Sequence, residues 1–298
     1  LDSGDLVQPH YDPAGERLVA TPRRSERDLA ILSPGTAMRS IASSTSDDHH
    51  ARWSPDGRFV VFVSRRSGHD ELWLASTDDQ QVRRLTRFDG ATVRYPAWHP
   101  DGQRILFTVQ ADAAEQLHEI DLITGQIAAV AGASPGATTP AWLPDGSRRV
   151  YGCGEATSDG ICIGDDTGGE RQIAQGYFRP TPIGDDAIVV LDRDGRLVRM
   201  SLDGDAGGIA WDGLPEGGRL AWDITSGALV YAMPGDIANG GRVIRRQLDS
   251  GEETVLYEGR MPLADGSIDA LPDGRVVITR FDAASDDLVW MRAPLSAR

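Results

Sequence analysis

The sequence predicts an all-β fold, a β-propeller of seven blades with four antiparallel strands in each blade. Two observations predict it. A turn centred on Pro-Asp-Gly or a close variant recurs at Pro13, Pro55, Pro100 and Pro144, at spacings of 42, 45 and 44 residues. Each copy also contains several short runs of β-forming residues. A repeat of about 40–45 residues with several short strands is typical of propeller blades.

The turn motif explains the first two strands of each copy. Proline presets φ, aspartate caps the turn and glycine takes the left-handed position, so the chain reverses between a short strand and a β-rich strand such as "RFVVFVS". The motif returns at Pro272, and two weaker copies place Gly184 and Thr225 at the proline position. Because those two copies are weak, six or eight blades remain alternatives.

The repeats assign the whole chain, 1–298, to a single propeller domain. We expect the repeats at approximately 5–46, 47–90, 91–134, 135–176, 177–215, 216–260 and 261–298. The last copy supplies three strands before the chain stops, so we expect residues Leu1–Leu6 to supply the fourth and close the ring. One equivalent position carries Trp53, Trp98 and Trp142, with Trp222 close to it in the sixth copy, and we expect these indoles to pack between blades.

Composition limits the class of protein. The chain has 298 residues, 40% of them hydrophobic, which is enough for a large core. Its formal net charge of −15 repels phosphate backbones, so no direct nucleic-acid contact is expected. No apolar run approaches the roughly 18 residues that would span a bilayer. The sequence does not begin with Met, and we interpret it as a fragment or processed product.

The two cysteines, Cys153 and Cys162, flank a polar loop in "GCGEATSDGIC". Residues that flank such a loop in a hairpin can lie opposite each other, within reach of a disulfide. A disulfide favours an oxidising compartment such as the periplasm. Two reduced, buried thiols are the alternative, and no further soft ligands nearby indicate a zinc site.

The stretch "DDHH" begins the innermost strand of the second copy, so its histidines are expected at the mouth of the central channel. The candidate ligand-binding residues are His49, His50, Arg94, Tyr95, Thr139, Arg179 and Arg219; Gln8, Thr138, Phe178 and Ser267 fall on the same ring. Such a mixture of polar and aromatic groups is common at ligand sites, although any solvated channel would also show it. Adjacent strand residues point to opposite faces, so the two histidines are not expected to hold a metal.

Motifs of catalysis give no support for an enzyme. The stretch "GASPG" (Gly132–Gly136) fits a nucleophile elbow by its spacing, but the residue after its serine is Pro135, which has no N–H for an oxyanion hole. The acidic loops "DRDG" and "LDGDAGG" lack the full spacing of a calcium loop. No glycine-rich phosphate loop follows a strand. We therefore expect a non-enzymatic binding module with no cofactor.

The copies "WSPDGRFVVFVSRRSGHDELWL" and "PAWHPDGQRILFTV" resemble the TolB-type β-propeller repeat. The match is strong at Trp53–Gly57 and Phe62–Ser64, good over copies two to four and poor over copies five and six. The resemblance implies a propeller fold and supplies no catalytic residues.

A longer stretch, Ile41–Phe107, resembles the C-terminal propeller of membrane-anchored winged-helix regulators of the ToxR/CadC type. That resemblance implies a periplasmic sensor domain of an inner-membrane transcriptional regulator, tethered through a segment ahead of Leu1. Its partner would be an unknown small molecule or an envelope protein, and a homodimer is compatible with the role.

Two other functions remain open. A free-standing periplasmic scaffold similar to TolB would bind envelope proteins. The propeller of a prolyl-oligopeptidase-like peptidase would gate a hydrolase domain, which would require about 250 further residues. Fold-level analogy does not separate these readings.

Overall fold

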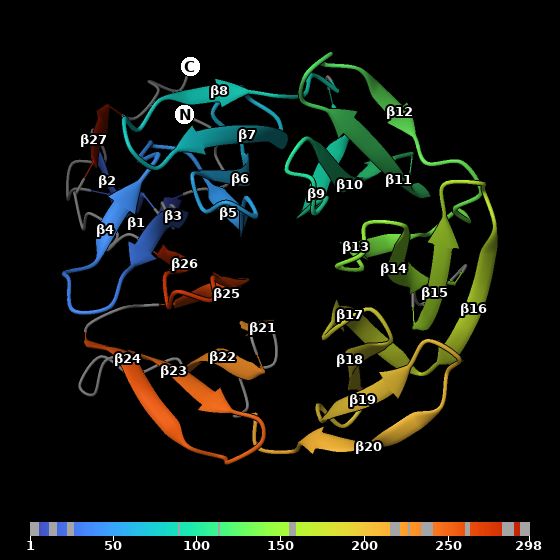
Figure 1. The fold of residues 1–298 in the computed structure, drawn as a ribbon. Helices are drawn as coiled ribbons and strands as arrows, with labels where there is room; N and C mark the ends of the chain where they lie inside the picture. Colours follow the sequence, from blue (N-terminus) through green and yellow to red (C-terminus); the bar gives the residue numbers. More distant parts are fainter. Residues whose placement is uncertain are drawn as a thin grey trace.

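The described part of the chain forms a ring of six four-stranded sheets around a central axis (Figure 1). The structure is a computed structural model that describes residues 6–11, 17–22, 27–88, 90–112, 114–154, 159–214, 221–225, 227–233, 241–259, 263–281 and 289–292. No helix within those ranges has the length and apolar character needed to cross a bilayer.

Five blades are built from four consecutive strands each, with the first strand innermost. Their strands are β5 (Asp48–Trp53), β6 (Phe59–Ser64), β7 (Glu71–Ser76) and β8 (Val82–Arg84); β9 (Thr92–Trp98), β10 (Arg104–Ala111), β11 (Ala114–Asp121) and β12 (Ile127–Ala129); β13 (Thr138–Trp142), β14 (Arg148–Cys153), β15 (Gly160–Asp165) and β16 (Glu170–Gln175); β17 (Tyr177–Pro182), β18 (Ala187–Asp192), β19 (Leu197–Ser201) and β20 (Ala206–Trp211); and β21 (Trp222–Thr225), β22 (Ala228–Met233), β23 (Gly241–Gln247) and β24 (Glu253–Gly259). Each of these blades lies within one of the five central repeats.

The sixth blade combines the two ends of the chain. Its inner strands are β25 (Leu263–Ala270) and β26 (Val276–Phe281), and its outer strands are β3 (Arg27–Leu32) and β4 (Arg39–Ile41). The prediction of seven blades is therefore wrong, and the alternative of six is what the structure shows. The first and last repeats share one blade, because β3 pairs with β26 over six residues from each strand.

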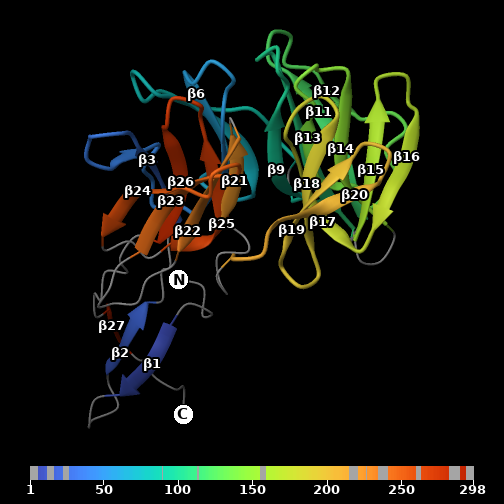
Figure 2. The same ribbon diagram turned by 60° about the horizontal axis from the view of Figure 1, so that its bottom comes forward.

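The remaining strands form a separate three-stranded sheet, in the order β1 (Leu6–Tyr11), β2 (Arg17–Pro22) and β27 (Val289–Arg292). Figure 2 shows this sheet apart from the ring, beyond the blade that contains β26. The expectation that Leu1–Leu6 closes the ring is thus wrong: Leu6 pairs with Pro22 in this sheet, and residues 1–5 lie outside the described residues. Gln8 belongs to the same sheet and not to the channel, and Pro13 lies outside the described residues.

Burial explains why β3 joins the ring. Its residues alternate between two cores: Leu29 and Ile31 pack with the β5–β6 side, whereas Ala30 and Leu32 pack with β22, β23 and β25. A strand that is buried on both faces needs a neighbouring blade on each side. The two-stranded unit β25–β26 alone could not fill that space, so the apolar stretch "RDLAIL" completes it.

The Pro-Asp-Gly turns join the two innermost strands of a blade. In the turn after β5, Gly57 has a φ of 65°, and the Gly57 N–H donates to the Ser54 carbonyl at 2.8 Å. The Asp56 carboxylate accepts a hydrogen bond from the Arg58 N–H at 3.1 Å. Aspartate and glycine therefore have the roles that the sequence predicts, and the turn sets the register of β5 on β6.

Most of the core lies between neighbouring blades. Phe62 and Phe107 are fully buried there, in the cores on either side of the β5–β8 blade. Trp53 and Trp142 keep only 5% and 6% of their surface exposed, which fits packing between blades, whereas Trp98 is less buried. A blade thus has no core of its own and depends on the closed ring.

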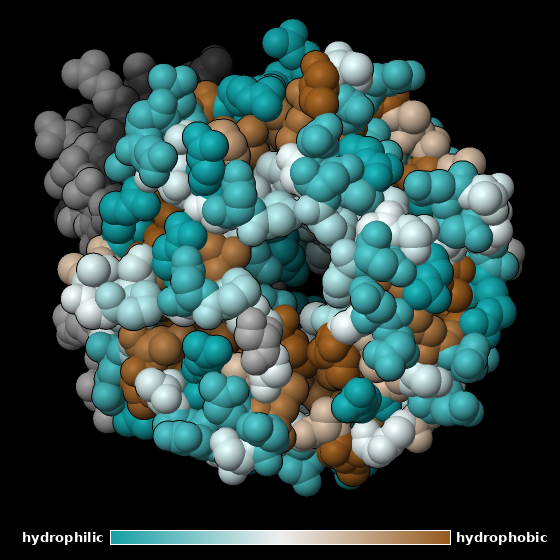
Figure 3. All heavy atoms as spheres, viewed as in Figure 1, coloured by the Kyte–Doolittle hydropathy of each residue, from teal (hydrophilic) through white to brown (hydrophobic). Residues whose placement is uncertain are grey.

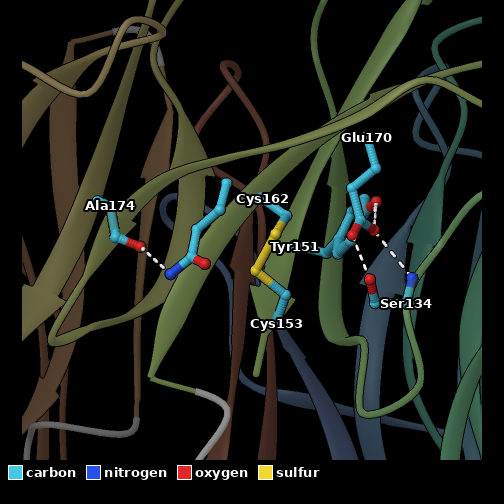
Figure 4. Close-up of a disulfide and its surroundings, with 7 residues drawn as sticks. Ser134, Tyr151, Cys153, Cys162, Glu170 and Ala174 are labelled. Atoms are coloured by element: carbon cyan, nitrogen blue, oxygen red, sulfur yellow. Dashed lines mark hydrogen bonds between the residues drawn. A yellow bond between two sulfur atoms is a disulfide. The ribbon is translucent and has the colours of Figure 1, made fainter. Parts of the chain in front are cut away.

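The two cysteines form a disulfide, as the sequence predicts (Figure 4). They are not directly opposite each other. Cys153 on β14 pairs with Gly160, and Cys162 on β15 pairs with Tyr151, so the bond joins diagonal neighbours whose Cα atoms are 5.8 Å apart. A Cβ at Gly160 would lie 2.7 Å from the Cys153 carbonyl oxygen, so glycine leaves the space that this close approach needs.

Candidate functional site: the central channel

The six innermost strands surround a cavity of about 700 Å³ on the ring axis. Figure 3 shows an opening at the centre of the face, framed mostly by hydrophilic residues. A volume of this size lies within the range of about 300–1,000 Å³ that is usual for small-molecule sites. All six inner strands contribute to its wall, so the cavity exists only in the closed ring.

Four blades bend their inner strand at the same position. His50, Tyr95, Thr139 and Arg179 all have positive φ, between 47° and 52°. Each sits in a β-bulge, where the register on the second strand of its blade shifts. All four line the cavity. Non-glycine residues in this conformation cost about 1–2 kcal/mol each, and such strain concentrates at functional sites.

Prolines in the sequence mark three of these four bulges. Pro96, Pro140 and Pro180 each follow a bulge residue directly. Proline lacks the N–H that a strand ladder needs, so a proline within a strand indicates a bulge or an edge. The innermost strand of each blade has one paired neighbour and otherwise faces the channel. In three blades the proline therefore marks where the register on that neighbour shifts.

The bulge brings His49 and His50 together, contrary to the expectation from strand alternation. Their Nδ1 atoms lie 2.7 Å apart, within hydrogen-bonding distance. The His50 ring then meets the Tyr95 ring edge-on, with 4.6 Å between centroids. Burial, and next the neighbouring His49, hold the pKa of His50 well below its usual value, so His50 is neutral at neutral pH. In the described part of the chain, no group of three or more metal-binding side chains accompanies the pair.

The remaining predicted residues divide into two sets. Thr138 and Phe178 line the cavity together with the bulge residues. His49 and Arg94 precede the bulges and do not line it, although Arg94 is close enough to contribute to the low pKa of His50. Ser267 is buried beneath β5, where its hydroxyl accepts a hydrogen bond from the Ala51 N–H at 3.4 Å. Arg219 lies outside the described residues.

Two aspartates that sequence reasoning missed lie on the cavity wall. Asp223 on β21 accepts a hydrogen bond from the Ala270 N–H at 2.9 Å, and Asp269 on β25 accepts one from the Trp53 N–H at 2.6 Å. Burial within the ring, and then the charge of Asp223, raise the pKa of Asp269 to about 8. Burial also raises the pKa of Asp223. Each carboxyl ties its own blade to the next blade around the ring.

Arg52 on β5 is the third missed residue and lies between the same blades. Its Nη1 donates to the carbonyl oxygens of Ala51 and Ile268, at 3.2 and 3.1 Å. The charge of Arg52 opposes the rise in the pKa of both Asp223 and Asp269, so its guanidinium interacts with the two carboxyl groups. Nothing in the repeat separates this arginine from a solvated strand residue, because the equivalent positions in the next two copies are Ala97 and Ala141.

Arg179 supplies a second cation on the cavity wall. Its Nη2 donates to the Trp222 carbonyl at 3.1 Å, and its guanidinium carbon lies 4.7 Å from the centroid of the Trp222 ring. Burial, and next the charge of Arg52, lower the pKa of Arg179 to about 10, so it stays charged at neutral pH. The indole face and the carbonyl hold the guanidinium in one orientation.

The rest of the wall is largely apolar. It consists of tryptophan, proline and small side chains from the end of the inner strands: Trp53, Pro55, Ala97, Trp98, Pro100, Ala141, Trp142, Pro144, Pro182, Ile224, Ala270 and Leu271. The cavity wall thus combines many apolar side chains with two arginines, two aspartates and His50. A few convergent polar groups in an apolar wall are the usual composition of a ligand site.

The serine of "GASPG" belongs to a hydrogen-bond network with a carboxylate and a tyrosine. The Ser134 hydroxyl donates to the Glu170 carboxylate, which also accepts from the Ser134 N–H at 2.9 Å and from the Tyr151 hydroxyl (Figure 4). Among the residues that the structure describes, no histidine takes part in this network. Its contacts join the loop before β13 to the outer strand β16, which is a structural role.

The fold, the turn motif and the channel agree with a comparison to known families. Residues 2–163 match the family model described as the TolB beta propeller domain, which is more than half of the chain. The chain belongs to this family. The resemblance that the turn motif suggests is thereby confirmed for the TolB-like domain, whereas no comparison shows the resemblance to ToxR/CadC-type sensors.

Individual curated proteins match this chain over short segments only. The Tol-Pal system protein TolB of Anaeromyxobacter sp. strain K is 44% identical over 57 residues, 19% of this chain and 13% of that protein. The uncharacterized peptidase YuxL of Bacillus subtilis is 41% identical over 69 residues, 23% of this chain and 10% of that protein. The matches thus span only about a tenth of these curated relatives.

Among solved structures, TolB from Acinetobacter baumannii is similar with a TM-score of 0.60. The sequence identity is 17%, and the similarity covers 80% of this chain and 66% of that one. At this identity the similarity supports the propeller fold and carries no statement about a ligand.

Proposed function

We propose that the chain is a non-catalytic binding domain of the bacterial cell envelope, a TolB-like protein-interaction scaffold whose central channel holds a segment of its partner. The ring of four strained bulge residues carries this proposal. The backbone conformation of each of these residues, His50, Tyr95, Thr139 and Arg179, costs free energy. All four residues line the same cavity. Folding alone does not require such strain, since glycine would relieve it at every position.

The disulfide supports the location in the envelope. Cys153 and Cys162 are the only cysteines of the chain, and they are bonded to each other. Disulfides persist in oxidising compartments such as the periplasm and are rare in the cytosol. Membership of the TolB family, with the Tol-Pal system protein TolB among the relatives, agrees with that location.

The absence of enzymatic activity is part of the proposal. Among the described residues, the titratable groups on the cavity wall are His50, Tyr95, Arg52, Arg179, Asp223 and Asp269. The Ser54 hydroxyl, also on the wall, donates to the Asp56 carboxylate at 2.6 Å within the Pro-Asp-Gly turn, which is a contact of the turn itself. The carboxyl groups of Asp223 and Asp269 are engaged with backbone N–H groups of neighbouring blades. These groups are suited to orient a ligand.

A second function has one observation in its favour. The match to the peptidase YuxL favours a domain that gates a hydrolase, and the same cavity would then admit a peptide. The sensor domain of a membrane-anchored regulator stays a prediction from the sequence. Reading the gene on both sides of this segment separates the three: a hydrolase domain, a winged-helix domain with a membrane helix, or neither.

Site-specific cross-linking tests the proposal. A photoreactive benzoylphenylalanine at Thr139, on the cavity wall, should cross-link to a partner in intact cells. The same residue at Gln126, which is exposed in the turn between β11 and β12, is the matched control. We expect adducts from position 139 that are absent from position 126. Equal adducts at both positions, or none at 139, would remove the channel as the partner site.

A further inference from the structure

We infer that His50 binds a hydrogen-bond donor of the partner segment through its Nε2 atom, and that proton uptake by the His49–His50 pair turns this atom from an acceptor into a donor. The channel therefore holds its partner at neutral pH and releases it at acidic pH. This inference rests on the proposed function of the channel and adds the chemistry of the contact and its regulation.

The two imidazole rings share one hydrogen bond. Their Nδ1 atoms lie 2.7 Å apart, and the rings meet edge-on with 4.6 Å between centroids. Two ring nitrogens at this distance hold one proton between them, because two N–H groups would repel each other and two bare nitrogens would place two lone pairs face to face. The protonation state of His49 therefore fixes the tautomer of His50.

The Asp70 carboxylate sets the tautomer of His49. Its Oδ1 lies 3.9 Å from His49 Nε2 and 3.4 Å from Arg65 Nε. Burial opposes the charge of Asp70, but the imidazole of His49 and the charge of Arg65 outweigh it and hold the pKa of Asp70 below its usual value, so Asp70 is ionised at neutral pH. A carboxylate favours an N–H on the ring nitrogen that faces it. Neutral His49 therefore carries its proton on Nε2 and leaves Nδ1 as an acceptor.

His50 consequently presents an acceptor to the cavity at neutral pH. Its Nδ1–H donates to His49, which leaves Nε2 as a bare nitrogen. In the part of the chain that the structure describes, this nitrogen has no hydrogen-bond partner, and it is not one of the fully buried polar atoms. His50 lines the cavity, whereas His49 does not. The hydroxyls of Tyr95 and Thr139 donate or accept, so His50 is the group among these three that selects the polarity of the ligand.

Proton uptake reverses the pair without leaving a charge on His50. A proton from the cavity binds His50 Nε2, and the proton on His50 Nδ1 crosses the 2.7 Å hydrogen bond to His49 Nδ1. His50 is then neutral with its proton on Nε2, and His49 is an imidazolium beside the Asp70 carboxylate. Burial, and next the charge of His49, hold the pKa of His50 well below its usual value, which agrees with a charge on His49 and not on His50. A donor of the partner now meets an N–H instead of a lone pair.

Other charged groups face the pair, and one of them titrates in the acidic range. Burial raises the pKa of Asp48 to about 6, although Ser64 and Arg66 oppose the rise. The Asp48 carboxylate accepts a hydrogen bond from Arg66 Nη2 at 2.8 Å. A test must therefore separate the histidines from Asp48. The further charged or titratable groups around the pair are Arg27 and Asp28 on β3, Asp47 before β5, Arg52 on β5, Arg65 and Asp70 between β6 and β7, Arg94 and Tyr95 on β9, and Asp269 on β25.

NMR of the imidazole nitrogens in the purified chain tests the switch without a partner. At pH 7.5 we expect His50 with its proton on Nδ1 and a bare Nε2. At pH 5.0 we expect a proton on His50 Nε2 and a doubly protonated His49. The H49N and H50N variants assign the two sets of signals. A proton on His50 Nε2 at pH 7.5, a doubly protonated His50 beside a neutral His49, or no change in either ring down to pH 5.0 would overturn the inference.

The D70N variant tests where the charge goes. Without the carboxylate, the His49 imidazolium loses its counter-charge, so the midpoint of the NMR titration should fall by about half a pH unit or more. The matched control is H69N, since His69 precedes Asp70 in the same loop and is exposed, and it should leave the midpoint unchanged. A midpoint that D70N does not lower would contradict the assignment of the charge to His49.

Cross-linking at two pH values tests the release of the partner. In permeabilised cells, benzoylphenylalanine at Thr139 should give about fivefold fewer adducts at pH 5.0 than at pH 7.5, because the partner loses its acceptor. H49N removes the ring that takes up the proton, and its amide oxygen still accepts from His50 Nδ1, so the yield should then change less than about twofold. H69N should show the full fall.

The outcomes separate this inference from the proposed function. Equal yields at both pH values in the otherwise unchanged chain would overturn the inference and leave the channel as the partner site. A full fall that persists in H49N would also overturn it, because Asp48 is intact in that variant and would then be the group responsible. No adduct at either pH would remove the proposed function together with the release, whereas the NMR result on the two rings would still stand by itself.

Discussion

The Trp53 N–H donates a hydrogen bond to the Asp269 carboxyl at 2.6 Å, across the junction between the first complete blade and the blade that closes the ring. Trp53 and Asp269 are more than 200 residues apart in the chain. The bond therefore forms only when the two ends of the chain meet. One side chain thus serves both the closure of the propeller and the charge of its channel.

Removing the Asp269 carboxyl should destabilise the ring. D269A leaves the Trp53 N–H without its acceptor, and an unsatisfied buried donor costs about 1–3 kcal/mol. D269N keeps a carbonyl oxygen as acceptor and should lose less. Chemical denaturation measures the free energy of unfolding of both variants. If D269A is as stable as the wild type, the bond does not contribute to closure.

The raised pKa of Asp269 predicts a pH dependence of stability. Between the usual value of 3.8 and about 8, the folded protein holds a proton that the unfolded chain has released. The contribution of this group to the free energy of unfolding therefore falls as pH rises through that window, and the loss is complete above pH 8. D269N should gain stability relative to the wild type from pH 5 to pH 8. A difference that does not vary with pH would show that Asp269 titrates normally.

Neighbouring threonines test the strain in the bulges. Thr139 has a φ of 47°, whereas Thr138 precedes it in extended conformation and is buried. T139G should raise the free energy of unfolding by about 1 kcal/mol, since glycine adopts positive φ without penalty. T138G should lower it by about 1 kcal/mol or more, because a side chain is lost from a strand. The same effect at both positions would contradict the assignment of strain to the bulge.

Arg83 and Arg84 on β8 test how much the contact of Arg84 with Glu71 stabilises the outer strand. Arg84 donates to Glu71 at 2.7 Å, and the Glu71 carboxylate, fully buried, also accepts from the Phe88 N–H. R84A leaves a buried carboxylate without its cation and should cost about 3 kcal/mol. R83A, next to it and exposed, should cost less than about 0.5 kcal/mol. Comparable losses in both variants would show that the contact with Glu71 adds little.

The disulfide should stabilise the chain. Closing so short a loop contributes about 2–3 kcal/mol in the chain-entropy model. Reduction should therefore lower the melting temperature of the wild type, and intact mass should rise by two hydrogens. The C153A/C162A variant is the control and should not respond to reductant. A wild-type chain whose thiols alkylate without reductant would contradict the bond.

The sequence predicts the local geometry of the blades better than the closure of the ring. The Pro-Asp-Gly turns and the five central repeats follow from short-range patterns such as Pro55 to Gly57. The number of blades depends on whether "RDLAIL" pairs with β2 or with β26, and both choices satisfy the local pattern equally. That choice is made by long-range packing on both faces of β3, which no short segment specifies.

The site was predictable only in part, for a similar reason. His50, Tyr95, Thr139 and Arg179 could be predicted as channel residues, because they occupy the same position before the turn in four copies of the repeat. The alternation rule fails at His49 and His50, since it assumes an extended backbone and His50 has positive φ. Arg52 and the two aspartates occupy positions where other copies carry alanine, threonine or tryptophan, so they become visible only when the blades are brought together.

The most direct test of the central claim is to fill the channel. T139W places an indole on the cavity wall at a bulge that already tolerates a side chain, so the melting temperature should stay within about 2 °C of the wild-type value. In intact cells, a photoreactive benzoylphenylalanine at Thr181, which also lines the cavity, should then give at least tenfold fewer adducts with the partner than it gives without T139W. A folded T139W variant that yields the same adducts at the same level would show that the partner binds elsewhere.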